Sequence, residues 1–330
     1  MILMRLAVKI MGIMLLVGVV FAALTHVIAS LRETRITNNT PPSGQFITDG
    51  DRRIHVQVMG AGPDLVMIHG ASGSLREFTF DLAHRLKDRY RVVLLDRPGM
   101  GYTDRAARRF QKPLSRAAES PLEQAQMLQI ATDVLGVNNP IVLGHSFGGA
   151  VALGWALSRP DDTAALVLVA GASQPWPGGL DLQYRLMDTT LGNLLIPPLV
   201  AAFTPHTVLH TAVKRVFAPE ITPAGYLDHI GTDLALRRST FRANAQQVNG
   251  LRPHVVDMSA LYQTLSLPVE ILHGTADVIV PLEIHSAPLA RQIPGAALTV
   301  LDGVGHMPHQ TAPEAVAAAI DRAAARAGLR

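Results

Sequence analysis

The sequence predicts an α/β protein built on a mostly parallel sheet that helices cover on both faces. Short apolar segments rich in β-branched residues recur along the chain, and helix-like stretches separate them. Strands that are apolar throughout, rather than alternating, are typical of parallel sheets that are buried on both sides. Apolar residues make up 48% of the 330 residues, which is enough for a large core.

The first expected element is an apolar N-terminal helix. Residues 10–31 carry no charge, and these 22 residues would span about 33 Å as a helix, enough for a bilayer core. We expect residues 1–33 to be a signal anchor that holds the rest of the chain outside the cytoplasm. A cleaved signal peptide is the alternative, because Val27-Ile28-Ala29 has small residues at the spacing of a cleavage site. The product would then be secreted or periplasmic.

The next segments are a tether and the strands. Residues 34–45 are polar, contain Pro41-Pro42, show no hydrophobic periodicity and predict a tether. Residues 44–60 alternate polar and apolar around Gly50, which predicts a β-hairpin. Apolar segments predict strands at 64–70, 90–96, 140–146, 165–171, 268–274 and 297–303.

One interval is too long for a simple crossover connection. Nearly a hundred residues, with several prolines and helix-like pieces, separate the strand at 165–171 from the strand at 268–274. We expect a helical cap at 172–262, inserted between two parts of the core at 46–171 and 263–330. Its apolar side chains are expected to pack against the core or to line a substrate pocket; they include Leu194, Leu195, Ile196, Leu199, Val200 and Phe203.

Composition excludes several classes of function. The net charge is only +3, and no Lys/Arg cluster is interleaved with aromatic residues, so nucleic acid is not an expected partner. The chain has no cysteine, which excludes disulfides, thiolate metal sites and a cysteine nucleophile. The histidines do not follow a metal-ligand spacing, so no metal or cofactor is expected.

The segment Gly144-His145-Ser146-Phe147-Gly148 fits the pattern G-x-S-x-G. It lies between a predicted strand and a predicted helix, which is the context in which this pattern forms a sharp turn. The turn strains the backbone of the serine and therefore requires small neighbours. Its hydroxyl then projects above the sheet, beside the N–H groups of a helix start. Ser146 is therefore the predicted nucleophile.

A neutral serine needs a histidine as base and a carboxylate that orients the histidine. In this type of fold the chain order is serine, acid, histidine. Asp277 follows the strand at 268–274, and His306 follows the last predicted strand. Both lie at the carboxyl ends of adjacent strands, where open α/β sheets gather their functional groups. We therefore predict Asp277 as the acid and His306 as the base.

Other histidines receive different predictions. His309 follows His306 by three residues and is the competing candidate for the base, although a structural role is favoured. His145 and His273 lie in or beside buried strands, so we expect them to be hydrogen-bonded core residues.

The oxyanion that forms during acyl transfer needs at least two N–H donors. Phe147 directly follows the nucleophile and offers its N–H at the helix start. The second donor is expected in the loop at 69–74, whose small residues let an amide face the pocket. Ala71 is the predicted donor, and Ser72 is the alternative.

These motifs resemble the α/β-hydrolase superfamily, over about residues 45–325. The matching segments are HGASG, LDRPGMGYTD, GHSFGGAVAL, LHGTADVIVP and GVGHMPHQTAPEAV, in the family's order. The resemblance implies an eight-stranded, mostly parallel sheet with a helical cap after the sixth strand. It also implies the triad Ser146, Asp277 and His306 with oxyanion donors Ala71 and Phe147. Thr103 stands where the family's Asp-Arg-Pro-Gly loop usually has serine.

The resemblance narrows the chemistry. Dehalogenases and epoxide hydrolases of this fold have an aspartate at the elbow, so Ser146 favours acyl transfer. We expect a serine hydrolase that cleaves a carboxylic ester, thioester or lactone of a small-to-medium apolar substrate, without a cofactor. The alternative is a carbon–carbon bond hydrolase of the meta-cleavage type, for which the cap offers Arg237, Arg238 and Arg242 to hold a carboxylate. A cofactor-free perhydrolase and a non-catalytic binding protein are lesser alternatives.

Overall fold

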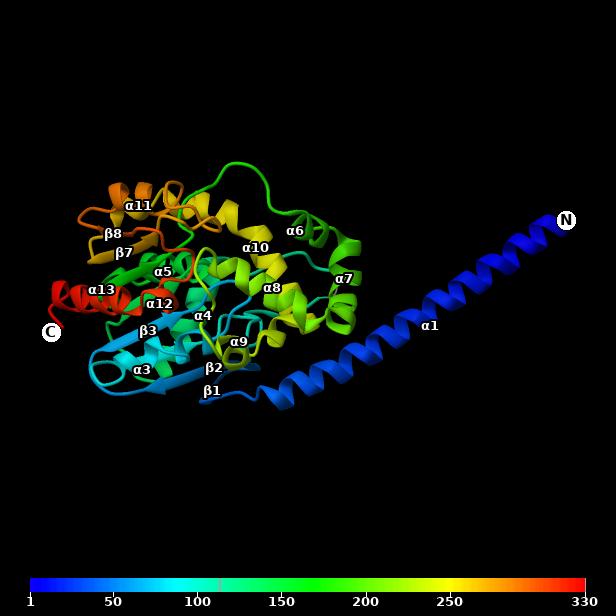
Figure 1. Cartoon of the computed structure of the whole chain (residues 1–330), viewed down its shortest axis with the longest axis horizontal. Helices are drawn as coiled ribbons and strands as arrows, with labels where there is room; N and C mark the ends of the chain where they lie inside the picture. Colours follow the sequence, from blue (N-terminus) through cyan, green and yellow to red (C-terminus); the bar gives the residue numbers. More distant parts are fainter. Residues whose placement is uncertain (113, 330) are drawn as a thin grey trace.

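The structure is a computed structural model that describes residues 1–112 and 114–329. Its centre is an eight-stranded sheet with the order β1-β2-β4-β3-β5-β6-β7-β8 (Figure 1). Strand β2 pairs antiparallel with β1 and with β4, whereas all pairs from β4 through β3 to β8 are parallel. The predicted mostly parallel sheet is thus confirmed.

Each apolar segment predicted as a strand forms one. The first two strands make the hairpin around Gly50, and β5 and β6 are buried over their whole length. The strands are β1 (Gln45–Asp49), β2 (Arg52–Met59), β3 (Asp64–Ile68), β4 (Arg91–Leu95), β5 (Ile141–His145), β6 (Ala165–Val169), β7 (Val269–Gly274) and β8 (Ala297–Leu301).

Helices cover both faces of the sheet, because successive strand side chains point to opposite sides. In β3, Val66 and Ile68 join the core beneath α4 (Pro121–Val134), α5 (Phe147–Ser158) and α11 (Ser286–Gln292). The alternate residues Leu65 and Met67 join the core on the opposite face. That core includes side chains of α2 (Arg76–Thr79), α3 (Leu82–Leu86) and α13 (Pro313–Arg326), and α13 follows the short helix α12 (Pro308–Thr311).

The predicted helical cap is also confirmed. Five α-helices lie between β6 and β7: α6 (Leu182–Met187), α7 (Thr190–Phe203), α8 (His206–Phe217), α9 (Tyr226–Ile230) and α10 (Arg238–Ser259). Several of the cap's apolar residues do not line a closed pocket. Leu194, Leu195, Leu199 and Phe203 of α7 are 37%, 53%, 38% and 49% exposed.

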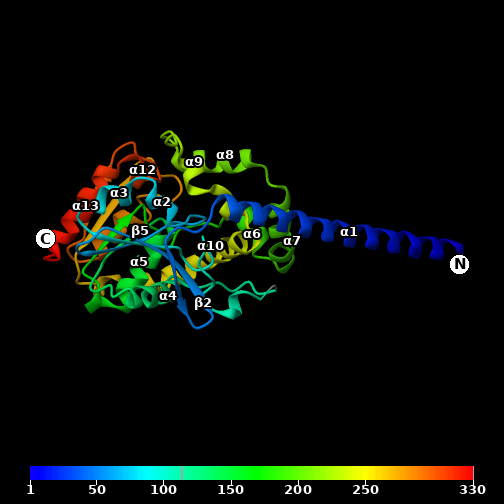
Figure 2. The ribbon, with the colours of Figure 1, turned by 90° about the horizontal axis from the view of Figure 1, so that it is seen from below.

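The N-terminal apolar segment forms the long helix α1 (Ile2–Asn39), which projects from the body as a rod (Figures 1 and 2). It is long and apolar enough to cross a membrane, and its most apolar stretch is not buried. Only its C-terminal part packs on the cap: Ala29 contacts a small core with Ala201 and Ala202, and Phe21 stacks on Phe203 with ring centres 6.3 Å apart.

The tether expected at residues 34–45 is helical in its first part, because α1 continues to Asn39. Ile36, within this stretch, is buried, and the two residues before the stretch fix the helix on the cap. Glu33 pairs with Arg238 of α10 at 2.7 Å, and Arg32 donates to the carbonyl oxygens of Ala202 and Thr204. The helix ends just before Pro41, which disfavours helical geometry in the residue that precedes it.

Candidate active site

The predicted nucleophile lies at a strained turn between β5 and α5. Ser146 has φ 52° and ψ −119°, a conformation that L-residues adopt only where the surrounding structure enforces it. Glycine is required on both sides. A Cβ atom at Gly144 would lie 2.2 Å from the carbonyl oxygen of Gly148, and one at Gly148 would lie 2.2 Å from that of Ile68. The glycines therefore allow the close approach that presents the serine hydroxyl.

The structure brings the three predicted triad residues together. His306 follows β8 and Asp277 follows β7, so the two loops meet beside the elbow. Nε2 of His306 lies 3.0 Å from Oγ of Ser146, and Nδ1 lies 2.7 Å from Oδ2 of Asp277. Because an ionised carboxylate only accepts, Nδ1 carries the proton, and Nε2 can accept the serine proton.

Asp277 is held as a carboxylate. Its Oδ1 accepts the N–H groups of Ile279 and Val280 at 2.8 and 2.9 Å, and its Oδ2 also lies 3.0 Å from Nε2 of His273. Burial alone would raise the pKa of Asp277, but hydrogen bonds from His273 and His306 hold this pKa well below its ordinary value. His273, predicted as a core histidine, is buried and helps to orient the acid.

His306 is neutral at pH 7. Burial lowers its pKa below the ordinary value of 6.5, and the nearby Asp277 only partly opposes this effect. A neutral imidazole is the form that a general base requires. The competing candidate, His309, is fully buried and contacts Glu77, with Nε2 3.0 Å from Oε1.

Phe147 directly follows the serine, and Gly70, which precedes Ala71, lies close to it: a Cβ atom at Gly70 would lie 3.1 Å from Cβ of Ser146. Phe147 is the first residue of α5, where backbone N–H groups have no partner within the helix. Ala71 is exposed in the loop after β3. The alternative, Ser72, donates its N–H to Oδ1 of Asn244 in the cap at 2.7 Å, which leaves Ala71 as the candidate for the second donor.

Arg97 orients the loop at residues 69–74 through hydrogen bonds to its main chain, a role that the sequence did not reveal. Its side chain is fully buried and donates to the carbonyl oxygens of His69 and Gly70 at 3.0 Å each. In a trans peptide the N–H points away from the C=O. Holding the Gly70 carbonyl therefore turns the N–H of Ala71 away from Arg97.

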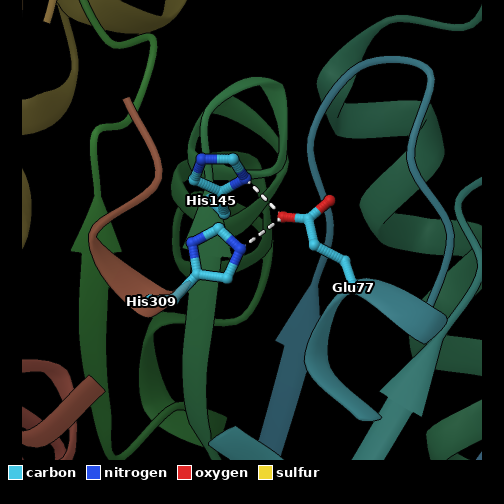
Figure 3. A group of neighbouring side chains, drawn as sticks. All are labelled: Glu77, His145 and His309. Carbon is cyan, nitrogen blue, oxygen red and sulfur yellow. Dashed lines mark ion pairs between the residues drawn. The ribbon is translucent and has the colours of Figure 1, made fainter. Parts of the chain in front are cut away.

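A second buried cluster adjoins the elbow. Oε1 of Glu77 lies 2.5 Å from Nδ1 of His145 and 3.0 Å from Nε2 of His309 (Figure 3). Their ligand atoms all lie within 4.8 Å of one another, so the three residues could approach one metal ion. Tetrahedral ligands of a zinc ion would lie about 3.3 Å apart, so the closer contacts are those of an ion pair. The three residues come from α2, β5 and α12, which is why no sequence spacing indicated the cluster.

Comparison with known proteins identifies the family. A model described as the alpha/beta hydrolase family matches residues 65–319. The chain belongs to this family. It is 29% identical over 279 residues to a pimeloyl-[acyl-carrier protein] methyl ester esterase from Nitrosomonas europaea, covering 81% of this chain and 98% of the relative. It is 26% identical over 274 residues to a 2-hydroxy-6-oxononadienedioate/2-hydroxy-6-oxononatrienedioate hydrolase from Klebsiella pneumoniae, covering 79% and 87%.

Solved α/β hydrolase structures agree with this fold. An esterase from Thermogutta terrifontis superposes with a TM-score of 0.68 at 21% identity, covering 86% of this chain and 99% of the esterase. A membrane phospholipase A superposes with a TM-score of 0.64 at 22% identity, covering 95% and 98%. Family membership and the relatives make the chain a hydrolase, with esterases among the proteins it resembles.

Proposed function

We propose that this α/β hydrolase is a membrane-anchored serine hydrolase that cleaves carboxylic esters of a small-to-medium apolar substrate through an acyl-enzyme on Ser146. The observation that carries the proposal is the hydrogen-bonded series Ser146–His306–Asp277, with a neutral base and an ionised acid. The same chemistry extends to thioesters and lactones.

The reaction follows from the geometry. Nε2 of His306 takes the hydroxyl proton while Oγ of Ser146 attacks the carbonyl carbon of the ester. The N–H groups of Phe147 and Ala71 stabilise the resulting oxyanion. The tetrahedral intermediate collapses, the alcohol leaves with the proton from His306, and an acyl-enzyme remains. Water, activated by the same histidine, then releases the acid.

The ion pair and hydrogen bonds that the cap arginines already make favour ester cleavage over carbon–carbon hydrolysis. Arg238 is paired with Glu33, and Arg242 donates to the carbonyl oxygen of Asn193 at 3.1 Å. Arg237 donates to the carbonyl of Gly101. A meta-cleavage product would need a cation for its carboxylate, and all three candidates already have structural partners.

Membrane anchoring is supported by α1 and its surroundings. An exposed helix that is apolar on all sides is unfavourable in water and matches a lipid environment. The exposed apolar residues of α7 lie next to the part of α1 that packs on the cap. We propose that the helix over residues 10–31 enters the bilayer with its free N-terminal part, that the end packed on the cap lies at the bilayer surface, and that the catalytic domain lies outside the cytoplasm. The fold neighbour described as a membrane phospholipase A is consistent with such an enzyme.

The test is ester hydrolysis by the full chain in detergent. p-Nitrophenyl esters from acetate to palmitate are offered to the wild type and to Ser146→Ala. We expect turnover that disappears in the variant, and a chain-length optimum that reports the size of the pocket. A folded wild type that neither hydrolyses these esters nor reacts with a serine-directed phosphonate would refute the proposal.

A further inference from the structure

Glu77, His145 and His309 form a buried cluster behind the nucleophile that the proposed hydrolysis does not use. Their exposed fractions are 6%, 3% and 0%. Figure 3 shows both imidazole rings directed at the same carboxylate oxygen. Burying charged groups is costly unless they are paired, so this arrangement calls for a function or a structural reason.

The second ring nitrogen of His145 connects the cluster to the base. Nε2 lies 3.0 Å from the main-chain carbonyl oxygen of His306. A carbonyl only accepts, so Nε2 carries a proton. Nδ1 faces Oε1 of Glu77, which also contacts Nε2 of His309. Both contacts are within ion-pair distance but lack hydrogen-bond geometry, and an oxygen this close to two ring nitrogens is best accommodated as an ionised carboxylate. His145 is then an imidazolium with protons on both nitrogens.

The pKa shifts of the three groups agree with an ionised Glu77 and a protonated His145. Burial alone would lower the pKa of His145, but Glu77 raises it above its ordinary value. Burial alone would raise the pKa of Glu77, but His145 and His309 hold it well below its ordinary value. Burial and the charge of His145 lower the pKa of His309 to about 4, so this ring is neutral. The other ionisable groups that interact with the cluster are His69, Arg97, Tyr226, Asp277 and His306.

We propose that His145, held by Glu77, is a positioning residue that fixes the backbone of His306 and thereby the place of its imidazole beside Ser146. This inference rests on the proposed function, in which His306 is the base. The backbone at His306 needs such support because residues 304–307 belong to no helix or strand. His145 directly precedes the nucleophile, so one strand sets the positions of both reacting side chains. A hydrogen bond from an imidazolium is roughly twice as strong as a neutral one.

Two substitutions that introduce amide side chains test the two contacts of the His145 ring separately. In His145→Gln, the longer side chain places an amide N–H near the former Nε2, where it can reach the carbonyl of His306. In His145→Asn, the shorter side chain places the amide near the former Nδ1, where it reaches Glu77 but not His306. Both variants lose the ring and its charge, so each is the control for the other. Thermal melting by circular dichroism verifies that both are folded.

We expect His145→Asn to lose about 10²-fold in kcat on a p-nitrophenyl ester, because small misplacements of a reacting group carry that cost. KM should change little, since the contact acts on the chemical step. His145→Gln should restore most of the lost kcat. The low-field proton resonance of the His306–Asp277 hydrogen bond, measured by NMR, should shift in the asparagine variant and return in the glutamine variant.

Three outcomes would overturn the inference. Equal kcat and unchanged resonances in both variants would show that His306 needs no such support. Equal losses in both would assign the effect to the ring volume rather than to the Nε2 contact. Inactivation of the wild type by a chelator, with recovery on adding Zn²⁺, would make the cluster a metal site. The resonance does not depend on ester turnover. If it follows the prediction while the wild type hydrolyses no ester, the positioning role stands and the proposed function fails.

Discussion

Nη2 of Arg97 lies 3.0 Å from the carbonyl oxygen of Gly70, and its guanidinium carbon lies 4.3 Å from the centre of the Phe147 ring. One buried cation therefore touches both segments that are proposed to supply the oxyanion donors. Its hydrogen-bonded side-chain partners are the amide oxygens of Gln124 and Gln247. Burial lowers the pKa of Arg97 to about 9, so it is charged at pH 7.

Replacing Arg97 by lysine should therefore damage the oxyanion hole. Lysine keeps the charge but lacks the planar fork that holds two carbonyl groups. If the N–H of Ala71 loses its direction, we expect kcat to fall by about 10²-fold, as when one oxyanion donor is removed. The comparison is Arg159→Lys, because Arg159 pairs with Asp133 at the surface. Equal kcat for the two variants would contradict the role given to Arg97.

The pH dependence of the reaction should follow His306. Its pKa lies below 6.5 because it is buried. Only the neutral ring accepts the serine proton, so kcat/KM should fall as the pH drops through that lowered pKa and should be constant around pH 7. Measurements of kcat/KM against pH, with buffers matched in ionic strength, test this expectation. If kcat/KM instead fell through a pKa above 6.5, the charge of Asp277 would outweigh the effect of burial on the pKa of His306.

Much of this site was predictable because local sequence dictates its geometry. The elbow at Ser146 depends on adjacent glycines, and the positions of Asp277 and His306 follow from the ends of two apolar strands. The contacts of Glu77 and Arg97 were not predictable, because their partners lie on elements far away in the sequence. The same reason explains the error at residues 34–39. This polar segment is helical because Ile36 is buried and because the preceding Glu33 fixes α1 on the cap through Arg238.

The Glu77–His145 pair should stabilise the fold within a limited pH window. The pKa of Glu77 is depressed, so its contribution is present above its ordinary value of 4.5 and is lost as the pH falls through the folded value. The pKa of His145 is raised, so its contribution is complete below 6.5 and is lost as the pH rises through the folded value. The pair therefore contributes most between these two ordinary values.

Glu77→Gln should accordingly be less stable than the wild type by about 3 kcal/mol in that window, because it breaks a buried ion pair. The difference should shrink at higher pH, and denaturant unfolding at several pH values measures it. Glu270→Gln is the matched control. Glu270 is also buried but pairs with Arg322 and Arg326, which stay charged, so its effect should not shrink. A pH-independent difference for Glu77→Gln would contradict the ion pair.

The apolar half of α1 should decide where the enzyme resides. We expect the full chain to stay with membranes after alkaline carbonate washing, because about 20 apolar residues suffice to span the hydrocarbon core. Removal of residues 1–31 should release the chain while keeping the Glu33–Arg238 contact to the cap. Replacing Leu16 and Val17 by arginine should also release it, because charges at the bilayer centre are expensive. The intact mass of the purified protein distinguishes a retained anchor from a cleaved signal peptide. A chain that begins at Ser30 and is found free of membranes would establish a cleaved signal peptide instead of an anchor.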